Sequence, residues 1–458
     1  MKLVSCLILC YLLIGCTSFA KKPDLTSLTK PSLPNLPPTW QTVQSNIGAV
    51  DVGWLDRLGD ELLKDLVREA LVHNRDLQAA SASVDRARAL AGQAKSALLP
   101  SLNYSLAGAE GGRVRDSSTD SYSSGLSLSW ELDVWGRVRA SRNAANYSAA
   151  SAQADYVFSQ YSFAAAVAQS YFLVIESKMQ EEVAQKSLSA LTETTRIVRS
   201  QREVGAADAY DEYLAAANMA AGEANLLQTQ VAKRFARRAL EILLGRYPDD
   251  RLNTVNQLPA VPPIPSAGLP SELLERRPDI IAAELTVASA FSDVGAAKAA
   301  RLPTFSLTGS LDITTSRASD VLDTDAGTWS LASALLGPLF DAGLRRSQVE
   351  AADAVQRQAI ANYAQIALTA FQEVENSLDQ NLVIAQRVSA LARSADAQNK
   401  AFNLAQLRYE EGETNLLDVL TIQSNTLSAD SNLVTARRQQ LDEWVNLNLA
   451  LGGDWDSP

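Results

Sequence analysis

Two stretches of the chain alternate between apolar and polar residues. In the first, Leu102, Tyr104 and Leu106 alternate with Ser and Asn, and the alternation resumes over 126–134 after a loop rich in Ser, Asp and Gly. The second stretch, from 304 to about 335, repeats this pattern on both sides of another polar loop. A period of two predicts two-faced strands, here four of them in hairpins at about 101–134 and 303–339.

These hairpins fit two settings. A soluble hairpin with one face on a core has the same alternation, but strands of about ten residues with aromatic residues toward their ends favour an outer-membrane barrel with a wet lumen. Four strands cannot close a barrel, because the smallest single-chain barrels of this kind use about eight and an open edge in lipid leaves backbone groups unsatisfied. Several chains are therefore required; two would fill the lumen with side chains, whereas three, giving three times four or twelve strands, can enclose a passage.

Each hairpin is followed by a long tract without proline that is dense in Ala, Gln and Ser. Such composition predicts long helices, and abundant Ala favours closely packed neighbouring helices over an isolated coiled coil. At about 1.5 Å per residue, such a tract reaches roughly 100 Å. The predicted pairs of antiparallel helices are 136–205 with 208–245, and 343–411 with 415–451.

The chain contains two copies of one unit. NRDLQAA at 74–80 aligns with RPDIIAA at 277–283, and the same offset of 203 aligns Pro100 with Pro303. From Gly136, which meets Gly343, the offset is 207. The second copy therefore has four extra residues between Pro303 and Gly343, which predicts an exposed loop of variable length in the hairpin.

The chain begins with an export signal. An apolar run over 3–14 follows Lys2 and is too short to span a bilayer. The run ends in Leu-Ile-Gly-Cys16, which matches a bacterial lipobox and predicts diacylglycerol on Cys16; the alternative is a buried cysteine in an ordinary signal peptide. Thr17, rather than Asp, indicates sorting to the outer membrane. The other two cysteines lie in the signal, so the mature chain has no disulfide or thiolate metal site.

Together these features predict the following segments: a signal peptide at 1–15, a lipidated tether at 16–58, a first repeat at 59–246, a proline-rich linker around the helical wall at 247–276, a second repeat at 277–452 and a tail at 453–458. The predicted fold class is an α+β membrane protein with four transmembrane strands and long antiparallel helical hairpins per chain, tandemly duplicated.

Composition excludes several functions. A net charge of −11 over 458 residues argues against nucleic acid, whose phosphates require clustered Lys and Arg. His73 is the only histidine, and we interpret it as a surface residue at a helix start. The chain lacks a set of nucleophile, base and orienting residue, so we expect no enzyme, no metal and no cofactor beyond the lipid on Cys16.

The turns between the long helices carry recurring residues. Gly205 and Gly412 suit the C-terminal caps, and Asp208 and Asn415 suit the N-caps of the return helices. Asp211 and Asp418 follow three residues later, where a carboxylate favours the helix dipole. The alternative is a ring of negative charge that holds a gate or admits cations, formed by these aspartates with Glu203, Glu212, Glu410, Glu411 and Glu413.

Five motifs resemble the TolC-type outer-membrane factor family, in its lipoprotein (NodT-like) efflux branch, over essentially the whole mature chain. They are SWELDVWGRVR at 129–139, REVGAADAYDE at 202–212, ERRPDIIAAE at 275–284, ARLPTFSLTG at 300–309 and LLDVL at 416–420. The resemblance implies a homotrimer whose 12-stranded β-barrel continues into an α-helical barrel across the periplasm.

The resemblance also implies partners, namely an inner-membrane transporter and a periplasmic adaptor that docks on the tips around 202–212 and 409–418. It makes the tip residues candidates for the gate and for adaptor docking: Gly205, Asp208, Asp211, Gly412, Glu413 and Asp418. The leading hypothesis is an outer-membrane exit duct for small molecules, anchored by lipid. The alternatives are a duct for type I polypeptide secretion and a non-channel helical scaffold.

Overall fold

The computed structural model describes residues 18–42, 53–112 and 118–453. The chain divides into two compact units: Met1–Pro34, Ala82–Asp155 and Asp279–Ala367 form unit 1, and Asn35–Ser81, Tyr156–Pro278 and Leu368–Pro458 form unit 2. Each unit contains parts of both sequence copies, because the long helices α6 (Arg137–Glu203) and α10 (Leu344–Glu410) pass from one unit into the other.

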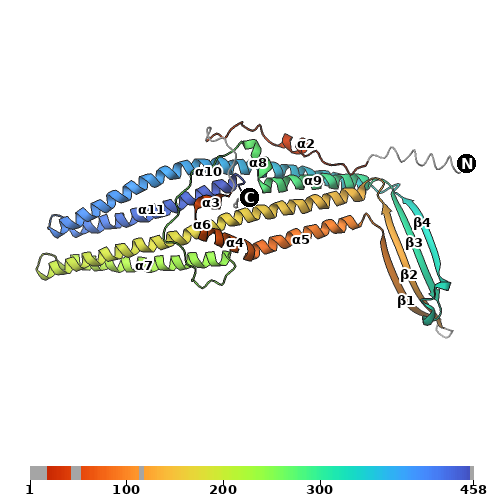
Figure 1. Cartoon of the computed structure of the whole chain (residues 1–458), viewed down its shortest axis with the longest axis horizontal. Coiled ribbons are helices and arrows are strands. Elements are labelled where there is room, and N and C mark those ends of the chain that lie inside the picture. The colour runs from red at the N-terminus through yellow and green to blue at the C-terminus, as the bar shows by residue number, and fades with distance from the viewer. Residues whose placement is uncertain (1–17, 43–52, 113–117, 454–458) are drawn as a thin grey trace. The chain divides into compact units, whose positions relative to one another are not determined.

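Unit 1 contains one antiparallel sheet. Its strands are β1 (Ser101–Gly112), β2 (Ser118–Leu132), β3 (Thr304–Thr315) and β4 (Thr328–Leu336), in the order β1-β2-β3-β4 (Figure 1). The four predicted strands are confirmed, and the second hairpin loop contains two 3-10 turns, η2 (Ala318–Asp320) and η3 (Thr324–Ala326).

Strand register confirms the repeat alignment. Ser101 pairs with Ser129 in the first hairpin, and Thr304 pairs with Leu336 in the second. The first partners differ by 203 and the second partners by 207, so the four extra residues lie in the hairpin loop. The register also aligns apolar residues on one face of the sheet, as in the row of Tyr104, Leu126, Leu311 and Trp329 across the four strands.

Unit 1 also contains a helical layer. It includes most of α5 (Arg75–Ser96) and α9 (Pro278–Ala299), the first parts of α6 and α10, and, on the N-terminal segment, α2 (Leu25–Thr29) followed by the 3-10 turn η1 (Lys30–Ser32). Helices α6 and α9 pack closely through small residues, since the Ser289 hydroxyl donates to the Ala144 carbonyl (2.9 Å) and the Ser151 hydroxyl donates to the Ala282 carbonyl (2.8 Å). Among the described residues, α9 alone is long and apolar enough to cross a membrane by composition, and burial of residues such as Val287 accounts for that character.

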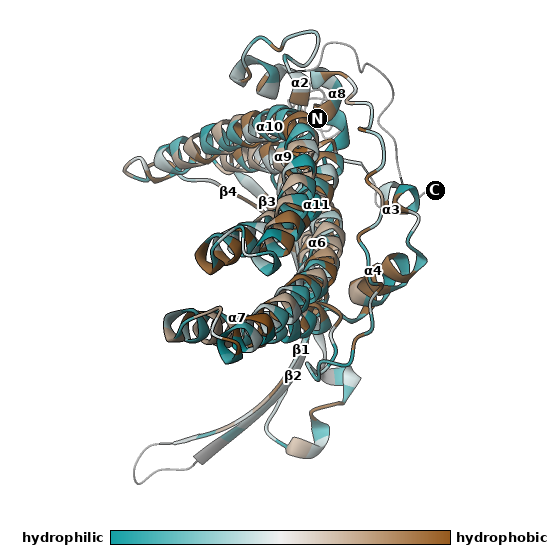
Figure 2. Cartoon of the chain, turned by 90° about the vertical axis from the view of Figure 1, so that its left-hand side faces the viewer, coloured by the Kyte–Doolittle hydropathy of each residue, from teal (hydrophilic) through white to brown (hydrophobic). Residues whose placement is uncertain are grey.

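Unit 2 contains α3 (Trp54–Leu58), α4 (Glu61–His73), α7 (Ala209–Leu243), α8 (Pro270–Arg276), α11 (Leu416–Ala450) and the remainder of α6 and α10. Its core includes Trp54, Phe172, Leu240 and Trp444. Helix α7 returns beside α6 and α11 beside α10 (Figure 1), and both return helices mix hydrophobic and hydrophilic residues along their length (Figure 2).

Three local expectations are corrected. The long helices run over 137–203 and 344–410 rather than from glycine to glycine, because each flanking glycine has a positive φ. The linker ends in α8, since Pro270 at its first position fixes a helical φ. His73 is the last residue of α4 rather than a helix start, because the Asn74 side chain caps the next helix by accepting from Asp76 and Leu77 N–H.

Candidate functional site

The turns that join the long helices have the predicted glycine caps. Gly205 has φ +81° and Gly412 has φ +76°, a conformation that favours glycine. In the first turn the Ala206 N–H donates to the Gln201 carbonyl at 2.8 Å, and in the second the Glu413 N–H donates to the Arg408 carbonyl at 2.8 Å. Both long helices therefore end with the same hydrogen bond, from the N–H of residue i+5 to the carbonyl of residue i.

The aspartates of the turns take part in helix capping. The Asp208 carboxylate accepts from the Asp211 N–H (3.0 Å), and the Asn415 side chain accepts from the Asp418 N–H (2.8 Å). The Thr414 hydroxyl donates to the Asp418 carboxylate at 3.1 Å. The prediction of Asp208 and Asn415 as N-caps is confirmed, and Asp211 and Asp418 supply the capped N–H groups.

The acidic residues of the tip differ in their surroundings. The Glu212 carboxylate forms ion pairs with Arg202 and, at 3.7 Å, with Arg199. The alternative of an acidic ring included Glu212 without these two arginines, Arg202 and Arg199, which lie ten and thirteen positions earlier, on the facing helix α6. The other acidic side chains are exposed, apart from half-buried Asp211; the exposed set is Glu203, Asp208, Glu410, Glu411, Glu413 and Asp418.

An apolar cluster lies beneath the two turns and joins all four helices. It includes Val198 of α6, Ala215 of α7, Tyr409 of α10 and Val419 of α11. The Tyr409 hydroxyl is buried without a hydrogen-bond partner among the described residues, and burial, followed by the Asp211 charge, raises the pKa of Tyr409. The two tips are therefore packed together through this apolar cluster.

A second polar cluster lies between α6 and α11 in unit 2. The Arg438 guanidinium donates to the carboxylates of Glu176 and Asp442, and the Thr435 hydroxyl donates to Glu176 at 2.6 Å. Burial raises the pKa of Asp442 to about 6, with Arg438 opposing the rise and Glu176 and Glu443 adding to it. One Asp442 oxygen is buried without a partner among the described residues. The carboxylates of Glu176 and Asp442 thus share the Arg438 guanidinium in a buried environment.

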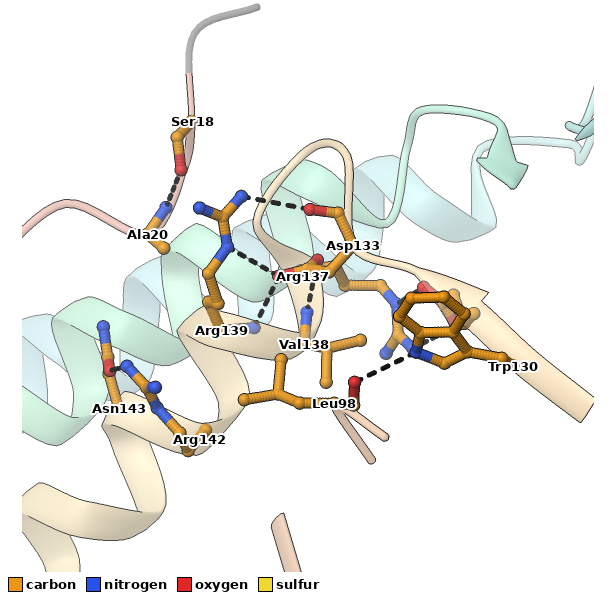
Figure 3. Close-up of polar contacts among 11 residues, drawn as sticks. Ser18, Ala20, Leu98, Trp130, Asp133, Arg137, Val138, Arg139, Arg142 and Asn143 are labelled. Atoms are coloured by element: carbon orange, nitrogen blue, oxygen red, sulfur yellow. Dashed lines mark hydrogen bonds and ion pairs between the residues drawn. The ribbon is translucent and has the colours of Figure 1, made fainter. Parts of the chain in front are cut away.

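The motif SWELDVWGRVR forms the junction between β2 and α6 (Figure 3). The Asp133 carboxylate accepts from the N–H groups of Val138 and Arg139 at 2.9 Å and pairs with the Arg139 guanidinium at 2.9 Å. The indole of Trp130 donates to the Leu98 carbonyl (3.0 Å), and that of Trp135 donates to the Pro303 carbonyl (2.6 Å). The motif therefore fixes how the strand enters the helix.

The N-terminal segment lies against this junction, where Figure 3 shows Ser18 and Ala20. The Phe19 N–H donates to the Trp135 carbonyl at 3.1 Å. A Cβ atom at Gly295 would lie 2.6 Å from the Phe19 carbonyl oxygen, so α9 has a glycine where the segment crosses it. Cys16, the predicted acylation site, lies outside the described residues, two positions before Ser18.

Among the residues that the structure describes, no group of three or more His, Cys, Asp or Glu is placed to hold a metal ion. The described chain instead combines a sheet that is apolar on one face with long helical hairpins that end in exposed acidic turns. These features define the class of outer-membrane channel proteins with a helical extension.

Comparison with known proteins gives the family. The sequence profile of outer membrane efflux proteins matches residues 66–246 and 269–453, and the chain belongs to this family. It is therefore an outer-membrane efflux protein. The pyoverdine export outer membrane protein OpmQ of Pseudomonas aeruginosa is 31% identical over 425 residues, covering 88% of each chain.

Solved structures show the same fold. The outer-membrane channel OprN is 29% identical, with a TM-score of 0.83 over 95% of this chain and 98% of that chain. The open state of the MtrE outer membrane channel of Neisseria gonorrhoeae is 28% identical, with a TM-score of 0.79 over 96% of this chain and 98% of that chain.

Proposed function

We propose that three copies of this chain form a closed duct through the outer membrane. The observation that carries the proposal is the sheet: within the described chain β1 and β4 each have a strand neighbour on one side only. Free strand edges are not tolerated in lipid, because no water satisfies their backbone groups. Three chains of four strands supply twelve, enough to enclose a passage.

We infer that the duct exports small molecules as the last component of a tripartite efflux system and catalyses no reaction. Family membership supports efflux, and the relative OpmQ is named for export of pyoverdine. An inner-membrane transporter would supply the substrate through a periplasmic adaptor. The exposed turns of unit 2, around 202–212 and 409–418, supply a docking surface for that adaptor.

We infer further that these turns form the gate. Asp208, Glu413 and Asp418 expose carboxylates there, and three copies would place several such charges around one opening. Like charges repel one another most strongly at low ionic strength, so the gate would respond to salt and to cations. The apolar cluster around Tyr409 would move with the turns as one body.

The duct is tested with purified protein in detergent and in planar bilayers. Native mass spectrometry should give a trimer, and the trimer should conduct ions. A stable monomer without conductance would reject the proposal. Deleting the gene should raise susceptibility to drugs, dyes, detergents or metals; unchanged susceptibility with loss of a secreted protein would assign the duct to polypeptide export instead.

The lipid anchor on Cys16 is proposed from the sequence motif. Cells grown with labelled palmitate should incorporate label into the wild-type protein and not into Cys16→Ser. Label in the Cys16→Ser protein would refute the anchor.

A further inference from the structure

The N-terminal segment, residues 18–42, is basic within an acidic chain. It carries three lysines and one aspartate, whereas the whole chain has a net charge of −11. The Asp24 carboxylate accepts from the Ser27 N–H at 3.3 Å and so caps α2. Lys21 and Lys22 are exposed, and neither forms an ion pair with another described residue. Two adjacent ammonium groups are therefore available to an anion from outside the described chain.

The two acids of the motif SWELDVWGRVR do not supply that anion. The Glu131 carboxylate pairs with Arg137, and the Asp133 carboxylate pairs with Arg139. The Asp133 oxygens also accept from the N–H groups at the start of α6. Each acid of the junction is thus matched by an arginine, and the two lysines beside it are surplus positive charge.

The segment is held at the end of the sheet. The Phe19 N–H donates to the Trp135 carbonyl at 3.1 Å, just after β2. The Phe19 carbonyl lies against Gly295, four residues before the C-terminal end of α9, which is about 6 Å along the helix. Lys21 and Lys22 follow Phe19 by two and three residues, so their backbone lies within about 10 Å of it.

The proposed duct places this level at the periplasmic surface of the membrane. The strands cross the hydrocarbon core, with ends at Leu132 and Thr304, and the headgroup layer beyond the core is about 5–8 Å thick. The proposed lipid on Cys16 gives the same level independently, because Cys16 is five residues before Lys21 and must lie at the leaflet that holds its acyl chains. The lipid also puts the segment on the outer side of the duct, toward the bilayer.

We propose that Lys21 and Lys22 bind the phosphate groups of anionic phospholipids in the periplasmic leaflet of the outer membrane. This inference rests on the proposed duct and its lipid anchor, and it names the partner of the segment's free cations. An ammonium group at an anionic bilayer surface gains roughly five-fold in affinity over a neutral one, and the gain extends only about one Debye length. The two lysines thereby hold the N-terminal segment, and the junction on which it is docked, at a fixed depth in the membrane.

Lys30 supplies an internal control. It belongs to the same segment, is exposed, and likewise forms no ion pair with another described residue. Its neighbour Thr29 forms a side-chain hydrogen bond with Tyr363 of α10. Tyr363 lies nineteen residues beyond the start of α10 at Leu344, about 28 Å along that helix. Lys30 is therefore more than two Debye lengths from the bilayer surface at physiological salt, where that length is about 8 Å.

Lysine acetylation measures the contact residue by residue. The purified lipidated protein is placed in nanodiscs of phosphatidylcholine, or of equal parts of phosphatidylcholine and phosphatidylglycerol, and treated with sulfo-NHS acetate before mass spectrometry. Phosphatidylglycerol should slow the reaction of Lys21 and Lys22 about five-fold and leave Lys30 unchanged, because an ammonium group held by a phosphate must leave it before the nitrogen can react. In about 1 M salt, where the Debye length falls to about 3 Å, the slowing should disappear.

Charge variants test the same contact from the side of the protein. In native mass spectrometry the double variant Lys21→Gln with Lys22→Gln should retain fewer phosphatidylglycerol molecules than the wild-type trimer, by about one per chain. Lys30→Gln should retain as many as the wild type. Lys21→Arg with Lys22→Arg should also match the wild type, because arginine keeps the charge.

The outcomes separate the lipid contact from the duct. A conducting trimer in which Lys21 and Lys22 react equally fast in both lipids, in which Lys30 is slowed as much, or in which the slowing survives high salt overturns the lipid contact and leaves the duct intact. Equal lipid retention by the glutamine variant overturns it as well. A monomer without conductance rejects the duct and the lipid contact together.

Discussion

Replacing Gly295 by alanine should release the N-terminal segment from the junction. A helix interior normally gains from this change, by roughly 0.8–1.0 kcal/mol, because alanine restricts the unfolded chain and suits the helix. At Gly295 the new Cβ would lie 2.6 Å from the Phe19 carbonyl oxygen and 3.7 Å from the Ala140 Cβ. The contact with oxygen is about 1 Å too short for van der Waals contact, so the N-terminal backbone must withdraw.

Withdrawal breaks the hydrogen bond from the Phe19 N–H to the Trp135 carbonyl, which contributes on the order of 1 kcal/mol. Loss of packing around Ser18 and Ala20 adds to that cost. We therefore expect the free energy that holds the segment to fall by about 1–2 kcal/mol, which corresponds to an open population about 5–30 times larger.

Gly92 supplies the matched control. It is the repeat equivalent of Gly295, it lies inside α5, and a Cβ there would meet nothing within 4 Å. Gly92→Ala should therefore stabilise its helix in the same way without disturbing the N-terminal segment. The too-short contact with the Phe19 backbone is present at Gly295 and absent at exposed Gly92, so a difference between the two variants reports on that crossing.

Trypsin measures the release, because exposed Lys21 directly follows the docked residues. Cleavage after Lys21, followed by mass spectrometry, should be about 5–30 times faster in Gly295→Ala than in Gly92→Ala or wild type. Cleavage at exposed Arg317 in the second hairpin loop should be equal in all three. Equal rates at Lys21 would refute the reasoning, since they would mean that the segment is not held across α9.

Three further changes test the helical unit. Folding raises the pKa of Asp442 from 3.8 to about 6, so the native state binds the proton more tightly and stability should rise as pH falls from about 7 toward 4; Asp442→Asn should flatten this profile in thermal unfolding, and an unchanged profile would contradict it. Asp208→Ala removes a helix cap and should cost about 1 kcal/mol, seen as faster proteolysis at Arg202; an unchanged rate would argue against the cap. Glu212→Gln keeps that cap but breaks the ion pair with Arg202, and should raise bilayer conductance at a stability cost below about 1 kcal/mol; equal conductance would separate this pair from the gate.

Much of the fold follows from periodicity and repetition. Alternation located the four strands, and the two offsets fixed which residues of the copies correspond, as the pairs Ser101 with Ser129 and Thr304 with Leu336 bear out. Glycine and asparagine or aspartate marked both tips, because a positive φ and an N-cap each require few residue types.

The features that the sequence did not reveal depend on contacts between residues that are far apart along the chain. Gly295 appears in the sequence as an unfavourable residue within a helix, and only the crossing of Phe19 explains it. The partners of Glu212 were missed because Arg199 and Arg202 belong to the preceding helix, and helix pairing decides which face they share. The repeat does not predict that each compact unit contains parts of both sequence copies, because a repeat reflects ancestry rather than packing.

Duplication leaves a surface that the chain cannot cover by itself. Within the described chain β2 pairs with β3, whereas β1 and β4 each have one edge without a strand neighbour. These two edges are the unused halves of an equivalent contact. A chain with two equivalent copies of one repeat must either close on itself or present those halves to another chain. Closing on itself would need a barrel of four strands, which is too few, so the halves must be satisfied between chains. The proposed trimer satisfies them with twelve strands, enough to enclose a passage.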